Sequence, residues 1–220
     1  MNEKRSSSEY SCADCASSAC VSGGREGHYP DFCLSQSAGE DRAADSLRQY
    51  LDDPMDRKLV LAAERVLAAG YEKWPRVQEV IAFAKAMRFR KIGIATCTAL
   101  LQESRTLAKM LRINGFEVYG VGCKVGELDK SSLDIPREYQ SMGTIACNPV
   151  LQAQLLAEEG TQLNIVMGLC VGHDILFSKY SQAPSTTLVV KDRVLVHNPA
   201  AAFYASDGCY SRLMRPLDDF

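Results

Sequence analysis

The segment Leu163–Asp174 concentrates three side chains that can do chemistry. It reads Leu-Asn-Ile-Val-Met-Gly-Leu-Cys-Val-Gly-His-Asp, so Cys170, His173 and Asp174 fall within five residues. The apolar run at its start is typical of a buried strand, and the glycines on either side of Cys170 predict a tight turn after it. A thiol, an imidazole and a carboxylate at the end of a buried strand indicate a candidate site, with Cys170 and His173 as its catalytic groups.

The chain has nine cysteines, which fall into two groups of four and one remainder. The first group crowds the N-terminal segment, and members of the second follow one another at intervals of about 25 residues. In a reducing cytoplasm, such cysteines serve as metal ligands or catalysts more often than as disulfides. The first group is Cys12, Cys15, Cys20 and Cys33, the second is Cys97, Cys123, Cys147 and Cys170, and Cys209 remains.

The N-terminal cysteines lie in a segment that lacks a core of its own. Residues 1–45 are rich in Ser, Gly, Ala and charge, and nearly free of large aliphatic side chains. Four soft ligands that include one Cys-x2-Cys turn can order such a segment around zinc or an iron–sulfur cluster. We therefore expect a small metal-binding module over residues 1–45, with Cys12, Cys15, Cys20 and Cys33 as ligands, and an α/β domain over residues 46–220. The alternative is a disordered tail with scattered cysteines.

Beyond residue 45, hydrophobic periodicity predicts two packing helices and then repeated strand–turn–helix units. This order is typical of an α/β fold, here a Rossmann-like three-layer sandwich with a mostly parallel sheet and a terminal hairpin. Residues 124–146 are polar without a clear period and predict a loop, which is a candidate cover for the site. The predicted helices span residues 54–70, 75–87, 100–114 and 149–159 with a last one from 199, and the predicted strands span residues 92–96, 116–122, 163–169, 186–190 and 193–197.

The second group of cysteines occupies equivalent places in this fold. Cys97, Cys123 and Cys170 each follow a predicted strand, and Cys147 precedes Asn148-Pro149, a cap residue and first-turn proline that predict the start of a helix. Open parallel sheets bind ligands at the carboxyl ends of their strands, so we expect the four thiols to converge there. Four thiolates can hold an iron–sulfur cluster or a single soft metal such as zinc. The alternative is burial as neutral thiols, since cysteine is among the most buried residues.

Three further side chains are candidates to assist this site. If a helix begins after the third strand, His173 lies at its mouth and can donate a proton beside Cys170. His197 follows the predicted hairpin and could approach the same edge, although a structural histidine bonded to a loop carbonyl is an equally good interpretation. Lys124 could lower the pKa of a thiol or hold an anionic substrate, whereas a solvated lysine is the simpler interpretation.

Four groups of residues carry a resemblance to a known family. They are Cys123-Lys124, Ala146–Pro149, Gly168–Asp174, and Lys191–Arg193 with the following His197–Pro199. Together they resemble the motifs of an uncharacterised family of cysteine-rich proteins, found largely in anaerobic bacteria and archaea and described as candidate metal-binding proteins. The resemblance spans nearly the whole chain, including the N-terminal cysteines. It implies metal binding and implies no reaction or substrate.

Composition and charge argue against several classes of partner. Hydrophobic residues make up 46% of the chain and charged residues 24%, and a net charge of −2 gives no electrostatic reason to expect nucleic acid or an anionic membrane. No apolar run approaches the ~18 residues that a spanning helix needs, and the first residues lack the apolar core of a signal peptide. We therefore expect a cytoplasmic protein. Neither a Gly-x-Gly-x-x-Gly nor a Walker-type loop is present, so nucleotide binding has no sequence support.

Three functions fit these features. The leading hypothesis is a metalloprotein that uses a cluster held by the second group of cysteines for electron transfer or reductive chemistry, together with a redox partner protein. The second is a metal-free enzyme with Cys170 as nucleophile, because Gly-x-Cys-x-Gly matches the spacing of a nucleophile elbow. In that enzyme His173 or His197 is the base, and the amides of Val171 and Gly172 bind an anion. The third is a non-catalytic sensor of metal or redox state that docks onto a partner through its N-terminal module.

Overall fold

The computed structural model describes residues 10–217, and contacts divide the chain into two compact units, Met1–Glu64 and Arg65–Phe220. The predicted boundary at residues 45 and 46 falls inside the helix α2 (Gly39–Asp52), which belongs wholly to the first unit. The two units are described separately below.

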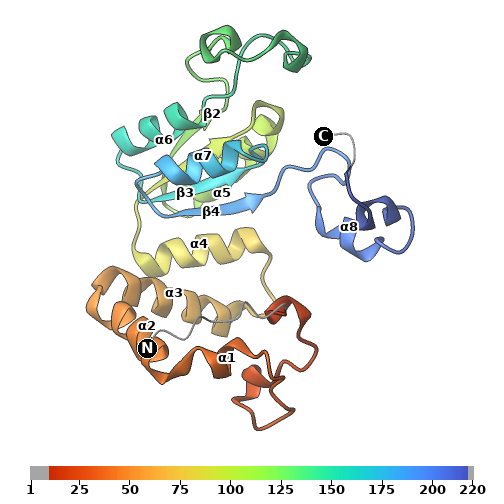
Figure 1. The fold of residues 1–220 in the computed structure, drawn as a ribbon. Helices are drawn as coiled ribbons and strands as arrows, with labels where there is room; N and C mark the ends of the chain where they lie inside the picture. Colours follow the sequence, from red (N-terminus) through yellow and green to blue (C-terminus); the bar gives the residue numbers. More distant parts are fainter. Residues whose placement is uncertain (1–9, 218–220) are drawn as a thin grey trace, which may run out of the picture. The chain divides into compact units, whose positions relative to one another are not determined.

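The first unit contains short helical turns followed by longer helices (Figure 1). Its turns are η1 (Cys12–Asp14), η2 (Ala19–Ser22) and α1 (Leu34–Ser37), and α2 and the first part of α3 (Pro54–Gly70) follow. The carboxylate of Asp53 accepts hydrogen bonds from the backbone amides of Met55 and Asp56, at 2.6 and 3.2 Å. This side chain satisfies amides that have no partner within the helix, and the predicted start of this helix at residue 54 is confirmed.

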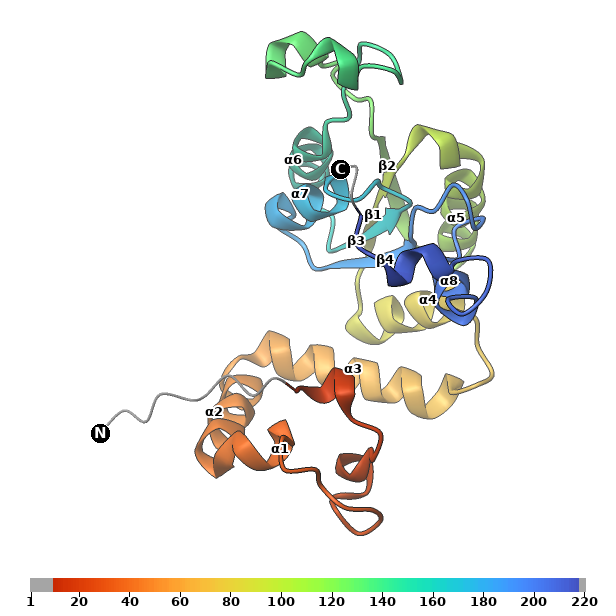
Figure 2. The ribbon, with the colours of Figure 1, turned by 45° about the vertical axis from the view of Figure 1, so that its right-hand side comes forward.

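The second unit is built on a four-stranded parallel sheet with the order β2-β1-β3-β4. The chain first passes from β1 through α5 to β2, and then returns through α6 to β3 on the other side of β1. Because such crossovers are right-handed, the two directions put helices on opposite faces, with α5 on one and α6 and α7 on the other (Figure 2). The Rossmann-like fold is confirmed. Its elements are α4 (Arg76–Met87), β1 (Lys91–Thr96), α5 (Leu101–Ile113), β2 (Glu117–Gly122), α6 (Pro149–Glu158), β3 (Leu163–Met167), α7 (His173–Tyr180) and β4 (Ser185–Val189).

The core of the second unit consists of the two central strands and the helices against them. All residues of β3 are buried, which explains why that strand reads as one continuous apolar run rather than an alternating one. On the α6 and α7 face, Phe177 and Leu156 are fully buried against Val166. The core therefore fixes the ends of β1 and β3, where the direction of the chain reverses and where such sheets bind ligands.

Two predictions about connecting segments are wrong. The terminal hairpin does not form, because β4 pairs in parallel with β3 and residues 193–197 are folded into turns rather than a strand. The segment 124–146 contains the helical turns η4 (Lys130–Leu133) and η5 (Arg137–Tyr139), closed by an antiparallel bridge between Asp129 and Ile145. It projects away from the sheet in both views and does not cover the carboxyl ends of the strands (Figures 1 and 2).

The chain beyond β4 adds a short helix, α8 (Ala200–Tyr204), which starts close to the predicted residue 199, and then a final helical turn, η6 (Ser211–Met214). None of the helices in the described part of the chain combines the length and the apolar character needed to span a bilayer.

Candidate functional site

Cys97 and Cys123 lie side by side at the carboxyl edge of the sheet. They follow directly the last paired residues of β1 and β2, Thr96 and Gly122. The interaction between the two thiols shifts their pKa values in opposite directions, and the backbone amide of Thr98 donates to the sulfur of Cys123 at 3.4 Å. Both side chains are buried, with exposed fractions of 8% and 2%. The parallel register of the first two strands thus brings together cysteines that are 26 positions apart in the sequence.

The interaction between the two thiols makes them unequal. The interaction with Cys123 lowers the pKa of Cys97 to about 5, against burial, and the backbone amide of Ala99 and the ammonium of Lys191 act in the same direction. The same interaction raises the pKa of Cys123, and burial raises it further. A backbone amide at a helix start and a nearby cation are usual means of stabilising a thiolate. At neutral pH, Cys97 is therefore the thiolate and Cys123 is the thiol.

Cys147 reaches the same edge through the start of α6. The backbone amide of Asn148 donates to the carbonyl of Cys123 at 2.8 Å, which ties the residue after Cys147 to the end of β2. The side chain of Asn148 then accepts from the amide of Leu151 at 3.0 Å and caps the helix, as predicted. Cys147 packs against the buried cluster that contains Cys97 and Cys123, and its charge acts on Cys123.

Cys170 is held by an arginine from the segment after β4. The guanidinium of Arg193 donates from Nη2 to the sulfur of Cys170 at 3.0 Å, and this interaction raises the pKa of Arg193. The backbone carbonyl of Cys170 accepts from the amides of His173 and Asp174, at 2.9 and 3.1 Å. The turn into α7 thus fixes the backbone of Cys170, while Arg193 holds its side chain.

Arg193 is positioned by a folded turn, not by a strand. The carboxylate of Asp192 accepts from the amides of Val194 and Leu195, at 2.9 and 2.8 Å. The amide of Asp192 donates to Nδ1 of His197 at 3.1 Å, and its carbonyl accepts from the amide of His197 at 2.9 Å. His197 therefore has a structural part in this turn, although its ring accepts from a backbone amide rather than binding a loop carbonyl as the sequence suggested.

The charges of these residues act on one another around a single edge. Coulombic interactions with Cys97 and Cys147 raise the pKa of Arg193. The interaction with Cys97 also raises the pKa of His173. Lys191 helps to lower the pKa of Cys97, and Lys124 helps to lower the pKa of His173. The ammonium of Lys124 also donates a hydrogen bond to the carbonyl of Ile145. Within residues 10–217, however, no group of three or more His, Cys, Asp or Glu side chains is already arranged to hold a metal ion.

His173 stands at the start of α7 and is partly buried. Burial lowers its pKa, with Lys124 and Arg193 acting in the same direction and Asp174 and Cys97 opposing them. The neutral imidazole is therefore favoured at pH 7, and this form accepts a proton readily. The prediction that His173 donates a proton remains a prediction, although the environment favours the proton-accepting form.

Comparison with known proteins identifies the family. A family model described as "Protein of unknown function (DUF1847)" matches residues 33–188. The chain belongs to this family. It is also 48% identical over 147 residues to an uncharacterized protein of the archaeon Methanocaldococcus jannaschii. The aligned region covers 67% of this chain and 76% of that protein. The DUF1847 match includes the four cysteines of the edge and His173 and leaves out Lys191, Arg193 and His197.

The N-terminal cysteines lie in the other unit, and the DUF1847 match takes in Cys33 alone among them. Cys12 and Cys20 are exposed, and Cys15 and Cys33 are partly buried. The rings of Tyr10 and Phe32 lie 5.7 Å apart between centroids, which brings the start of the cysteine segment beside its end. A shared metal at these four residues stays a prediction.

Three residues that shape the site, Lys191, Arg193 and Gln152, had no role predicted from the sequence. Lys191 and Arg193 belong to the Lys191–Arg193 motif, and they follow shortly after the last strand. That position could have indicated a role at the carboxyl edge of the sheet. Gln152 is fully buried in α6, where its amide nitrogen donates to the carbonyls of Thr96 and Val121, at 3.2 and 2.7 Å. Its side-chain oxygen is buried without a hydrogen-bond partner in the described part of the chain. Gln152 thus ties together the strand ends that carry Cys97 and Cys123.

Proposed function

We propose that Cys97, Cys123, Cys147 and Cys170 form a soft-metal centre, an iron–sulfur cluster or zinc, that serves electron transfer or reductive chemistry in the cytoplasm. The observation that carries this proposal is the packing of Cys97, Cys123 and Cys147 in one buried cluster, together with Arg193, which binds the sulfur of Cys170 and also interacts with Cys97 and Cys147. Thiolates are the ligands that zinc and iron–sulfur clusters prefer. A redox partner protein would exchange electrons at this edge.

The charges around the cysteines support this proposal. Four thiolates around a divalent metal leave a net charge of about −2, which must be balanced in a partly buried site. Lys191 interacts with Cys97, and Arg193 lies 3.0 Å from the sulfur of Cys170. Neutral buried thiols would need no such cations. The donor set and its counter-charges fit a tetrathiolate centre, and loading requires the four side chains to move to ligating distances.

In this proposal the residues around the cysteines have distinct roles. The strand ends and the start of α6 hold the thiols, and the bound group supplies the one-electron or Lewis-acid chemistry. Arg193 and Lys191 stabilise the negative charge of the thiolates. His173, favoured in its neutral form, would take up the proton that a substrate releases on oxidation and would give it back on reduction. Cys12, Cys15, Cys20 and Cys33 would hold a second, structural metal in the N-terminal module.

Anaerobic purification followed by iron, sulfide and zinc analysis tests this proposal. We expect Cys97→Ser and Cys170→Ser each to lose one metal centre per chain, and Cys12→Ser to lose only the metal of the N-terminal module. Cys209→Ser is the matched control, since this exposed cysteine lies outside both groups. A wild-type chain that holds no metal under these conditions, or equal loss in the control, overturns the proposal.

A second candidate function is a metal-free enzyme that uses Cys170 as nucleophile. The observation that favours it is the hydrogen bond from Arg193 to the Cys170 sulfur, which places a cation beside the candidate nucleophile. His173 in its neutral form is the base. Alkylation of Cys170 by a mild electrophile separates the two functions: rapid reaction in the protein as purified supports the enzyme, and reaction only after chelation supports the metal.

A further inference from the structure

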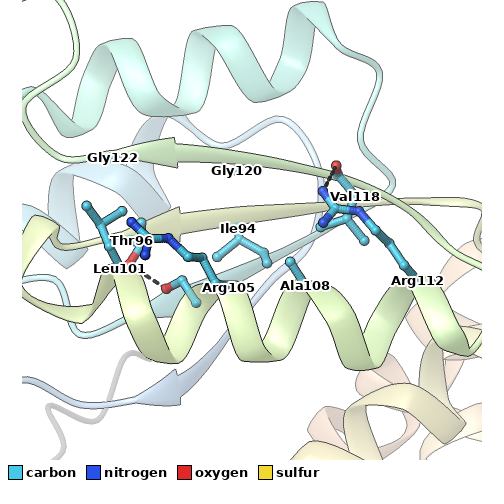
Figure 3. A pocket seen from close by; sticks show the side chains of 10 residues that line it. Ile94, Thr96, Leu101, Arg105, Ala108, Arg112, Val118, Gly120 and Gly122 are labelled. Carbon is cyan, nitrogen blue, oxygen red and sulfur yellow. Dashed lines mark hydrogen bonds between the residues drawn. The ribbon is translucent and has the colours of Figure 1, made fainter.

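A groove of about 280 Å³ lies between α5 and the two strands β1 and β2 (Figure 3). It is separate from the cysteine site, because successive residues of a strand face opposite sides of the sheet. Thr96 and Gly122 face this groove, whereas Cys97 and Cys123 pack with the cluster on the α6 and α7 face. The residues that line it and matter here are Ile94, Thr96, Ser104, Arg105, Arg112 and Gly120.

Two glycines on β2 keep the groove open, and the fold does not require glycine at either position. Gly120 and Gly122 are two residues apart on β2 and so face α5 together. A Cβ atom at Gly120 would meet nothing closer than 3.9 Å, and one at Gly122 nothing closer than 3.8 Å. Glycine weakens a strand and often marks a place where a ligand approaches the backbone. Since a Cβ atom would fit at both positions, packing does not require glycine here.

Two arginines supply uncompensated positive charge at the groove. Arg105 and Arg112 are seven residues apart on α5, which places them on one face about 10.5 Å apart along the helix. Figure 3 shows Arg112 reaching toward Val118, whose carbonyl accepts its hydrogen bond at 3.3 Å, and Arg105 extending toward Thr96. Among residues 10–217, the side chain of Arg105 has neither an ion pair nor a hydrogen bond, and no carboxylate lines the groove.

The rest of the lining is suited to a small organic molecule. The hydroxyls of Thr96 and Ser104 lie 2.6 Å apart on the floor and are buried, with exposed fractions of 3% and 7%. Ile94 and Ala108 add apolar surface between the two arginines. A molecule with an anionic group at each end and a short apolar middle would match this order of side chains.

We propose that the groove binds a small dianion, with one phosphate or carboxylate group held by Arg105 and the other by Arg112. Arg is well suited to this task because its planar guanidinium binds both kinds of group through two parallel hydrogen bonds. This binding site lies on the α5 face and does not depend on the metal or thiol chemistry proposed above.

Isothermal titration calorimetry of the full chain with 1,6-hexanediol bisphosphate and with adipate tests this inference, and 1,6-hexanediol serves as the neutral control. Binding of one or both anions supports it, and their comparison distinguishes a phosphate site from a carboxylate site. Arg105→Gln and Arg112→Gln are each expected to weaken binding at least tenfold. Lys109→Gln, an exposed cation on the same helix, is expected to change binding less than twofold.

A second variant separates the groove from general surface charge. Gly120→Leu places a side chain in the groove, keeps both arginines, and is expected to weaken binding at least tenfold with an unchanged circular dichroism spectrum. Cys97→Ser is expected to bind the anions as tightly as the wild type does. The anion site can therefore be confirmed even if the metal proposal is refuted. Absence of binding by both anions, equal binding of hexanediol, or equal weakening in Lys109→Gln overturns the inference.

Discussion

The inequality of Cys97 and Cys123 can be tested by the pH dependence of alkylation. The thiolate is the form that reacts with iodoacetamide, so the rate follows the thiolate fraction. The interaction with Cys123 lowers the pKa of Cys97 to about 5, so Cys97 is already a thiolate at pH 6. We expect its alkylation rate in metal-free folded protein to stay almost constant between pH 6 and pH 8.

The size of the expected difference follows from the two pKa values. A thiol with a pKa of about 5 goes from about 91% to nearly 100% thiolate between pH 6 and pH 8, a change of about 1.1-fold. A thiol with the ordinary pKa of about 8.5 goes from about 0.3% to about 24%, a change of about 75-fold. The comparison uses the shape of the profile of one residue, so the low exposure of Cys97, 8%, slows every point equally and leaves the ratio unchanged.

Peptide-resolved mass spectrometry measures this ratio, with the same cysteine in urea-unfolded chain as the ordinary reference. Cys123→Ala removes the interacting thiol, and we expect the steep profile of an ordinary thiol to return at Cys97. Cys123→Ser keeps a hydroxyl that can donate, and we expect a shallower profile than in the alanine variant. A wild-type rate at Cys97 that rises about tenfold per pH unit from 6 to 8 would refute the reasoning.

Three further predictions concern the segments that hold the site. Gly168→Ala is expected to destabilise the fold by about 2–4 kcal/mol in urea unfolding, because Gly168 has a φ of +63° and its Cβ would lie 2.2 Å from a buried leucine side chain. Gly160→Ala, with a φ of +67° and no neighbour within 4 Å, is expected to cost only about 1 kcal/mol. Asn148→Ala removes the cap of α6 and is expected to cost about 1 kcal/mol in the same assay. Arg193→Gln removes the cationic donor to the sulfur of Cys170, so alkylation of Cys170 at pH 7 is expected to slow by roughly 3- to 10-fold.

The fold was largely predictable because its signals are local. Continuous apolar runs bounded by glycine and helix-start residues predicted β1, β2 and β3 within one or two residues of their observed bounds. Asn148-Pro149 predicted the start of α6, since the side chain caps the helix and proline needs no amide partner there. The order of strand, helix and strand then leaves few topologies open, because parallel crossovers are right-handed.

The segment after β4 was mispredicted because a side chain competes with the backbone there. Alternating apolar residues at positions 194 and 196 favoured a strand with one buried face, yet Val194 is 72% exposed and Val196 is 87% exposed. The carboxylate of Asp192 binds the amides of Val194 and Leu195, and aspartate is known to offer such local alternatives to a strand. Val196 and His197 then take positive φ values of 52° and 62°, which no strand contains.

The wrong prediction of a strand at residues 193–197 limited how much of the site could be predicted. The positions of Cys97, Cys123 and Cys170 follow from strand ends, so their common edge could be inferred from periodicity alone. Their chemical differences could not, because these depend on which sulfur receives a proton donor or a cation. The cations come from the turn after β4, whose pattern predicted a strand and so concealed them. Strand register therefore predicts where the thiols lie, and the folded turn that carries Lys191 and Arg193 determines which of them have a cation beside the sulfur.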